Sequence, residues 1–171
     1  LEAFALIKKK CPDAKLNVAG SGPLRLDLEQ LSEQLGIAES VTFTGRLDNK
    51  EMAEIYRGTD LLLNSSLADN MPISLLEALA CGVPIVTTNV GGIPYLVEDS
   101  RTALLVDPGN PQMMAAAAMQ VLSNPDLAAL LRKNGLAVVQ NYAWSKVREQ
   151  WFSVYMGVLQ DCKLKADEAS S

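Results

Sequence analysis

The most informative stretch of this chain reads SSLADNMPISLLEALACGVPIV over residues 65–86. A polar loop leads into Pro72 and then into a short, almost wholly apolar run that carries one carboxylate, Glu77. A lone charge in such a run costs several kcal/mol, by rough estimate, unless hydrogen-bond donors or water surround it. We therefore predict a short helix that begins at Pro72 and turns Glu77 toward a polar site.

The start of this predicted helix suits an anion. Proline has no N–H group to leave unpaired in a first turn, and the free N–H groups that follow it attract negative charge. The N–H groups around Ile73 and Ser74 are therefore candidates to bind phosphate, while Glu77, just over one turn further, accepts hydrogen bonds from vicinal hydroxyls. Phosphate together with a diol describes the ribose end of a nucleotide.

Composition narrows the class of protein. The chain has 171 residues, of which 49% are hydrophobic, which fits one domain over residues 1–162 and a disordered tail over 163–171. A net charge of −5 argues against nucleic acid or an anionic membrane surface as a partner. Histidine is absent, which excludes a His-dependent triad or a His-ligated metal within this chain. Three scattered cysteines indicate neither a disulfide framework nor a zinc site, as in a cytoplasmic protein.

Short β-type runs alternate with helical patterns along the chain. This order is typical of parallel βαβ units and predicts an α/β fold with a doubly wound parallel sheet. The predicted strands are Leu16–Ala19, Val41–Thr44, Leu61–Asn64, Ile85–Thr88 and Ala103–Val106. Apolar spacing and helix-ending residues predict the main helices near 24–35, 52–56, 112–122, 127–139 and 145–159.

Asp69 and Glu77 are separated by seven residues, and Glu77 opens the run Glu-Ala-Leu-Ala-Cys-Gly-Val-Pro. This pattern resembles the signature of glycosyltransferase family 4, the retaining nucleotide-sugar enzymes of GT-B fold. Motifs along nearly the whole chain agree with it: Ala19-Gly20-Ser21-Gly22-Pro23, Phe43-Thr44-Gly45 and Val90-Gly91-Gly92-Ile93-Pro94. The resemblance is to the Rossmann-like, C-terminal half of these enzymes. It implies that the first strand, an arginine and a lysine for the diphosphate, and the N-terminal acceptor domain are missing from this chain.

The resemblance also implies roles for individual residues. Glu77 would hold the ribose hydroxyls, and Asp69 would act as the catalytic residue, contacting the transferred sugar or assisting the transition state. Asp69 stands where the family usually has glutamate, so its carboxylate reaches less far. Asn70 and Met71 would lie beside the donor sugar. The remaining nucleotide-binding positions implied are Gly20, Gly22, Arg46, Leu47, Ile73 and Ser74, with the base near the Leu47 backbone.

Each motif also has a purely structural interpretation. The turn Gly20-Ser21-Gly22-Pro23 can simply connect a strand to a helix through backbone angles that favour glycine. The run Gly91-Gly92-Ile93-Pro94 can be a plain loop before a one-turn helix. Arg46 can be a solvated surface cation, and Glu77 can pair with a nearby cation or backbone group. The aromatic residues near the C-terminus have the spacing of a packing face more simply than that of a sugar platform: Trp144, Trp151, Phe152 and Tyr155.

We therefore expect the donor-binding domain of a bacterial-type retaining glycosyltransferase that transfers a hexose-type sugar from UDP- or GDP-sugar to a saccharide or lipid-linked acceptor. Polysaccharide assembly in the cytoplasm, peripheral at most to the inner membrane face, is the implied setting. The implied partner is a nucleotide sugar, and no metal or other cofactor is implied. Two alternatives are a nucleotide-sugar epimerase domain and a non-catalytic nucleotide-binding module.

Overall fold

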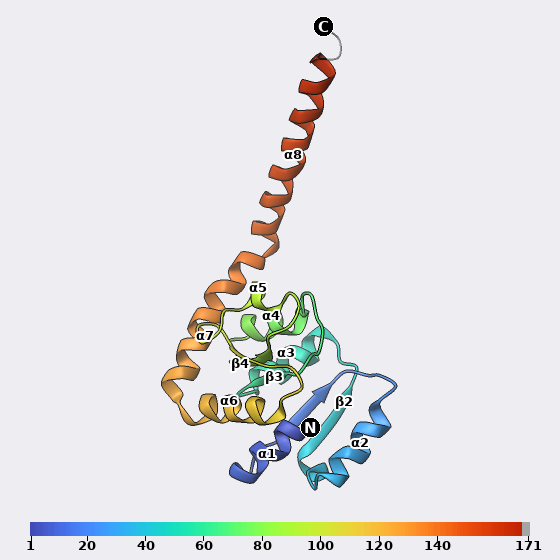
Figure 1. Cartoon of the computed structure of the whole chain (residues 1–171), viewed down its shortest axis with the longest axis vertical. Coiled ribbons are helices and arrows are strands. Elements are labelled where there is room, and N and C mark those ends of the chain that lie inside the picture. The colour runs from blue at the N-terminus through green and yellow to red at the C-terminus, as the bar shows by residue number, and fades with distance from the viewer. Residues whose placement is uncertain (169–171) are drawn as a thin grey trace. The chain divides into compact units, whose positions relative to one another are not determined.

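A computed structural model describes the backbone of residues 1–168 and the side chains of residues 1–160 (Figure 1). Two compact units divide the chain, Leu1–Leu136 and Ala137–Ser171, where the sequence predicted one domain over residues 1–162. Every predicted site residue lies in the first unit. The second unit consists chiefly of one long helix.

Strands and helices alternate through the first unit. Its strands are β1 (Leu16–Ala19), β2 (Val41–Gly45), β3 (Leu62–Asn64), β4 (Ile85–Thr88) and β5 (Leu104–Val106), so the predicted strands are confirmed with ends that differ by at most one residue. Its helices are α1 (Glu2–Lys10), α2 (Arg25–Gln34), η1 (Ala38–Ser40), α3 (Asn49–Arg57), α4 (Ile73–Ala80), α5 (Ile93–Leu96), α6 (Pro111–Ser123) and α7 (Pro125–Val139), the last of which runs past the boundary at Leu136.

All strand pairs are parallel, as predicted, but they form two sheets in place of one continuous sheet. β1 pairs with β2, and β4 lies between β3 and β5. Within the described residues β1, β2, β3 and β5 each have one partner strand, so each leaves one edge unpaired. The sequence pattern identifies strands by their apolar content, whereas the hydrogen-bonded neighbour of each strand depends on the tertiary path.

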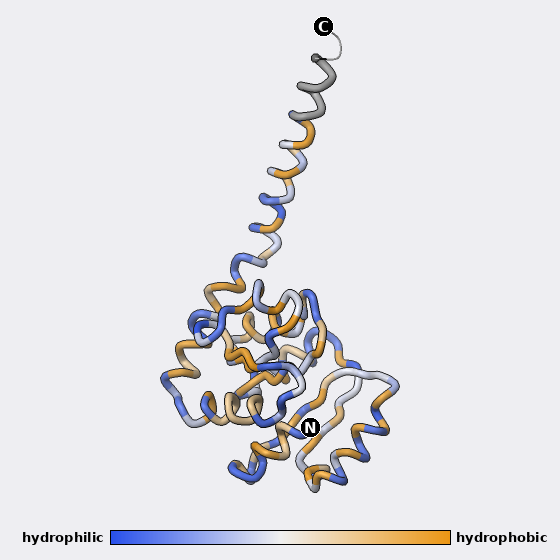
Figure 2. Tube along the Cα trace, viewed as in Figure 1, coloured by the Kyte–Doolittle hydropathy of each residue, from blue (hydrophilic) through white to orange (hydrophobic). Residues whose placement is uncertain are grey.

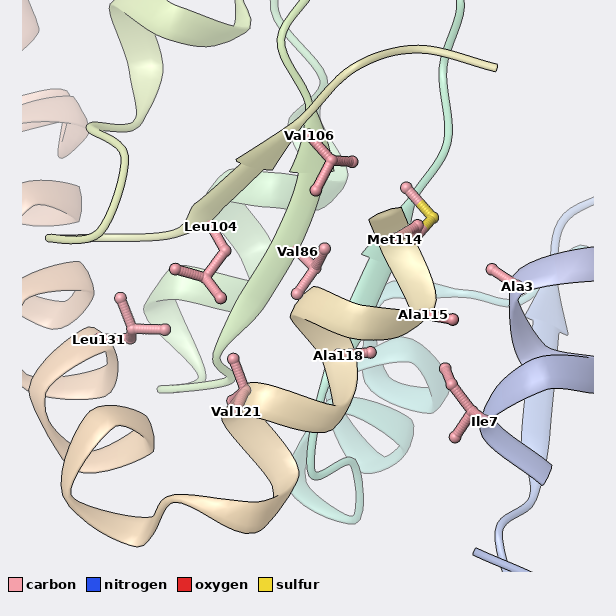
Figure 3. Close-up of a cluster of buried hydrophobic side chains, with 10 residues drawn as sticks. All are labelled: Ala3, Ile7, Val86, Leu104, Val106, Met114, Ala115, Ala118, Val121 and Leu131. Atoms are coloured by element: carbon pink, nitrogen blue, oxygen red, sulfur yellow. The ribbon is translucent and has the colours of Figure 1, made fainter. Parts of the chain in front are cut away.

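The larger sheet holds the core. β4 is buried along its whole length, which accounts for its unbroken apolar and threonine sequence. Helix α6 packs small and medium side chains against β4 and β5, and α1 and α7 complete the cluster (Figure 3). The buried members are Ala3, Ile7, Val86, Leu104, Val106, Met114, Ala115, Ala118, Val121 and Leu131. This packing fixes the ends of β3 and β4, from which the candidate site is built.

The second unit contains η2 (Gln140–Tyr142) and α8 (Trp144–Glu168). The backbone is helical as far as Glu168, well into the segment 163–171 predicted as a tail, and residues 169–171 lie outside the described residues. Apolar and polar residues interleave along α8 (Figure 2). Trp144, Trp151, Phe152 and Tyr155 are 55–69% exposed, and the rings of Trp151 and Tyr155 stack at 5.7 Å. No helix among the described residues is long and apolar enough to cross a membrane.

Candidate nucleotide-sugar site

Helix α4 presents two different faces because its apolar residues recur at helical spacing. Leu75, Ala78 and Leu79 are at most 1% exposed and anchor the helix in the core. The opposite side carries Ile73, which is 64% exposed, and the half-buried Glu77. The predicted polar surroundings of Glu77 therefore follow from the spacing that buries its neighbours.

The carboxylate of Glu77 has a defined partner. Its Oε2 accepts a hydrogen bond from the hydroxyl of Tyr56, in the last turn of α3, at 3.1 Å. No ion pair involves Glu77 among the described side chains, although a cationic partner was one structural interpretation of this residue. A half-buried carboxylate with one donor retains hydrogen-bonding capacity for a ligand.

The N-terminus of α4 has no side-chain cap. Pro72 is the N-cap residue, so the helix begins one residue later than predicted, and no side chain accepts a bond from its first N–H groups. The first residues, Ile73 and Ser74, are exposed. By contrast, the side chain of Asp48 accepts bonds from two N–H groups at the start of α3. Of these two helices, only α4 offers its first amide groups to an external anion.

The loop between β3 and α4 is held from two directions. The Oδ1 atom of Asp69 accepts a bond from the Met71 N–H at 3.1 Å, and the Asp69 carbonyl accepts one from the Gly92 N–H at 2.9 Å. A Cβ atom at Gly91 would lie 2.0 Å from the Asp69 carbonyl oxygen, and one at Gly92 would lie 1.8 Å from that of Asn70. The two glycines thus permit a contact between backbones that no side chain would allow.

Gly20 and the loop after β2 meet at the end of the smaller sheet. The Gly20 N–H donates to the Gly45 carbonyl at 2.8 Å, and Gly20 adopts a φ of +127°, which strongly favours glycine. Gly22 has open space around it. The residues after Gly45 line an open hollow of about 800 Å³: Arg46, Leu47, Asp48, Asn49, Lys50 and Glu51.

The structure thus sorts the predicted residues, apart from Gly22, into two groups. Gly20, Arg46 and Leu47 are joined through the backbone at the ends of β1 and β2. The segment from Asp69 to Glu77 forms the second group, at the end of β3. Helix α3 connects them, because it begins beside Leu47 and its Tyr56 contacts Glu77.

Two features were missed by sequence reasoning. Tyr56 lies in the helix predicted near residues 52–56 but was given no role at the site, although it is the aromatic residue of a helix otherwise rich in charge. Gly91 and Gly92 were favoured as a plain loop, whereas each closely approaches the Asp69 loop. Adjacent glycines are a usable signal of close approach, but the sequence does not name the segment that approaches. Among the described residues, no group of three acidic or cysteine side chains is placed to hold a metal ion.

Comparison with known proteins adds to this geometry. Residues 1–138 match the family described as glycosyl transferases group 1. The chain belongs to this family. One relative, the N-acetyl-alpha-D-glucosaminyl L-malate synthase of Bacillus anthracis, is 35% identical over 164 residues, which cover 95% of this chain and 42% of the relative.

Solved structures of similar proteins show the same fold. The sucrose-phosphate synthase of Thermosynechococcus elongatus superposes with a TM-score of 0.82 at 27% identity, over 94% of this chain and 42% of that one. Anabaena Alr3699/HepE, solved in complex with UDP-glucose, gives a TM-score of 0.80 at 22% identity, over 90% and 44%. The predicted resemblance to glycosyltransferases is confirmed at the level of group 1, and the predicted Rossmann-like GT-B fold is confirmed. The chain spans less than half the length of each of these proteins.

Proposed function

We propose that this chain binds the nucleotide-sugar donor of a glycosyltransferase, and that the larger enzyme transfers a hexose-type sugar to a saccharide or lipid-linked acceptor with retention. One observation carries the proposal. Helix α4 combines uncapped N–H groups at Ile73 and Ser74 with the Glu77 carboxylate slightly over one turn further. That spacing matches the order of diphosphate and ribose along a nucleotide.

Each group on α4 has a distinct chemical role in this proposal. The N-terminus carries about half a positive elementary charge from the helix dipole, which favours the diphosphate without requiring a metal ion. Glu77 accepts from the ribose hydroxyls, because an ionised carboxylate is an acceptor only. Asp69 is the proposed catalytic residue facing the donor sugar, beside Asn70 and Met71.

The hollow beside Leu47 is the proposed location of the base. It is bounded by the loop that follows β2, and Gly20 is hydrogen-bonded to the residue before Arg46. Arg46 is exposed there, so it is available to the phosphate side of the nucleotide. Helix α3 would then span from base to ribose, a distance of about 12 Å for the rise between Asp48 and Tyr56.

The comparisons support this proposal at the level of the family. The relatives reported above are synthases, and HepE was solved with a nucleotide sugar, UDP-glucose. Neither the epimerase nor the non-catalytic module is favoured by them. The acceptor domain, the acceptor and a cytoplasmic location belong to the proposal. The proposal also includes a strand from outside this chain, which pairs with the open edges of β1 and β3 and brings cationic side chains to the diphosphate. The unpaired edges of these strands support it.

The test is a titration of the chain with UDP, GDP and ADP, followed by ligand-observed NMR that detects millimolar affinities. Glu77→Gln removes the charge and keeps the shape of the side chain. Charge-assisted hydrogen bonds contribute about 1.5–3 kcal/mol each, so we expect affinity to fall roughly 10- to 150-fold.

A matched control is Glu33→Gln, the same substitution at an exposed position on α2. It should leave the affinity of the preferred nucleotide unchanged. Binding of one nucleotide in preference to the other two would identify the base. Loss of that binding in Glu77→Gln would support a donor site. Equal affinities of the wild type and Glu77→Gln would remove the ribose assignment, and absence of binding by all three nucleotides would contradict the proposal for this chain.

A further inference from the structure

Tyr56 lies almost fully inside the first unit, with its hydroxyl directed at α4. The residue is 4% exposed and belongs to the last turn of α3. Its hydroxyl is within hydrogen-bond distance of two acceptors on α4, Glu77 Oε2 at 3.1 Å and the Ser74 carbonyl oxygen at 3.3 Å. Tyr56 therefore contacts both Glu77, which is proposed to bind the ribose, and Ser74, whose N–H is proposed to face the diphosphate.

The hydroxyl acts as a donor in this arrangement. Burial raises the pKa of the Tyr56 phenol, and the adjacent Glu77 carboxylate raises it further through its charge and its hydrogen bond. The phenol is consequently protonated throughout the physiological range. It has a single proton for two acceptors, and the shorter contact is to the ionised group, which is the stronger acceptor.

This bond orients the Glu77 carboxylate. A glutamate side chain loses conformational entropy when a ligand immobilises it. A bond from Tyr56 to Oε2 fixes the carboxylate before the ligand arrives, and no hydrogen bond to Oε1 occurs among side chains 1–160. This orientation leaves Oε1 available to a ligand hydroxyl. Because the Glu77 side chain is already ordered, ligand binding loses less conformational entropy.

We propose that Tyr56 is a positioning residue that pre-orients Glu77 for the vicinal hydroxyls of the donor ribose. The inference rests on the proposed function, since it requires that Glu77 bind the ribose. It adds a residue that touches no part of the donor itself. The competing interpretation is that Tyr56 is a core residue and that its buried hydroxyl only forms hydrogen bonds with the nearest acceptors.

The substitution Tyr56→Phe separates these interpretations because it keeps the ring and removes only the oxygen. The probes are UDP and 2′,3′-dideoxy-UDP, which differ in the ribose hydroxyls alone. Binding of both probes is measured for the chain, for Tyr56→Phe, for Glu77→Gln and for the double variant. Tyr95→Phe, at a site 90% exposed, is the matched control, and circular dichroism checks that each variant is folded.

We expect Tyr56→Phe to weaken the binding of UDP about 5- to 20-fold, less than Glu77→Gln does, because it removes the orientation of the Glu77 carboxylate and leaves the carboxylate itself in place. Affinity for the dideoxy probe should not change, and the double variant should bind UDP as weakly as Glu77→Gln alone. Tyr95→Phe should bind both probes as the wild type does.

Three results would overturn the inference. If Tyr56→Phe binds UDP within twofold of the wild type while Glu77→Gln weakens it, Tyr56 does not position Glu77, and the proposed function stands. If Tyr56→Phe weakens both probes equally, or if the two substitutions add, Tyr56 acts through the fold and not through Glu77. If the wild type binds neither these probes nor the GDP and ADP pairs of the same design, or if Glu77→Gln binds the preferred nucleotide as the wild type does, the ribose assignment and this inference fail together.

Discussion

The contact between the Gly91–Gly92 turn and the Asp69 loop can be tested by adding a single methyl group. Gly92 has φ −88° and ψ −5°, which alanine adopts without strain, so Gly92→Ala probes proximity alone. The new Cβ would lie 1.8 Å from the Asn70 carbonyl oxygen. Because Cβ atoms essentially never come within 3.0 Å of another heavy atom, the two segments must separate by about 1.2 Å, the difference between these distances.

That separation has a cost that can be assembled from its parts. Overpacking costs about 1–3 kcal/mol, and the bond from the Gly92 N–H to the Asp69 carbonyl contributes roughly another 1 kcal/mol if it breaks. Replacing glycine by alanine returns about 0.4–1 kcal/mol through the unfolded chain. We expect a net loss of about 2 kcal/mol, which corresponds to a Tm lower by roughly 4–8 °C.

Urea denaturation followed by circular dichroism measures this loss. Gly58→Ala is the matched control, because Gly58 has φ −94° and ψ 8° and its Cβ would find no atom closer than 3.8 Å. Gly58→Ala should unfold at or slightly above the wild-type midpoint, and Gly92→Ala at a clearly lower one. Coincident midpoints for the two variants would refute the argument that close backbone approach requires glycine at position 92. We also expect donor binding to weaken in Gly92→Ala, since a shift of about 1 Å at a binding loop is large on the scale of site geometry.

Three further predictions concern other parts of the first unit. The phenol of Tyr56 has a pKa raised above its ordinary value of 10.0 by burial and by Glu77 and Cys81. Its contribution to the stability of the folded state is therefore complete below pH 10 and is lost as the pH rises further. Between pH 8 and pH 11 the Tm should fall less steeply in Tyr56→Phe than in the wild type, and parallel curves would contradict this. Asp48→Ala removes the cap of α3 and should lower the free energy of unfolding by about 1 kcal/mol in urea titration, whereas Asp48→Asn should restore most of it. The buried Thr87 hydroxyl has no hydrogen-bond partner among the described residues, so Thr87→Val should raise the urea midpoint, and a lower midpoint would indicate that this hydroxyl is paired in solution.

Much of the fold could be predicted because its signals are local. The strand at Ile85–Thr88 is buried along its length, and a run of four β-branched residues bounded by Pro84 and Asn89 is sufficient to indicate it. The start of the helix after Pro72 was likewise predicted to within one residue, from proline chemistry and apolar spacing. The division into two sheets was not predicted, because hydrogen-bonded edges depend on which strands the tertiary path brings together.

The candidate site divides in the same way. Glu77 could be singled out from the sequence because an isolated carboxylate in an apolar run needs hydrogen-bond donors or water around it. Its partner could not, since Tyr56 is 21 positions away and the intervening strand sets the distance between α3 and α4. The role of Asp69 in the fold was also hidden, because its carbonyl is held by Gly92, from the turn after a different strand.

The sequence by itself therefore determined where the strands and the main helices lie, the parallel α/β class, the family and the carboxylates to examine. These properties depend on periodicity, backbone restrictions and motif order, all of which are encoded over short distances along the chain. Only the tertiary structure decided that Tyr56 holds Glu77, that two glycines admit the Asp69 loop, and that Gly20 joins the turn at Gly45. Those are contacts between segments far apart in sequence, and their geometry is set by how the helices pack on the strands.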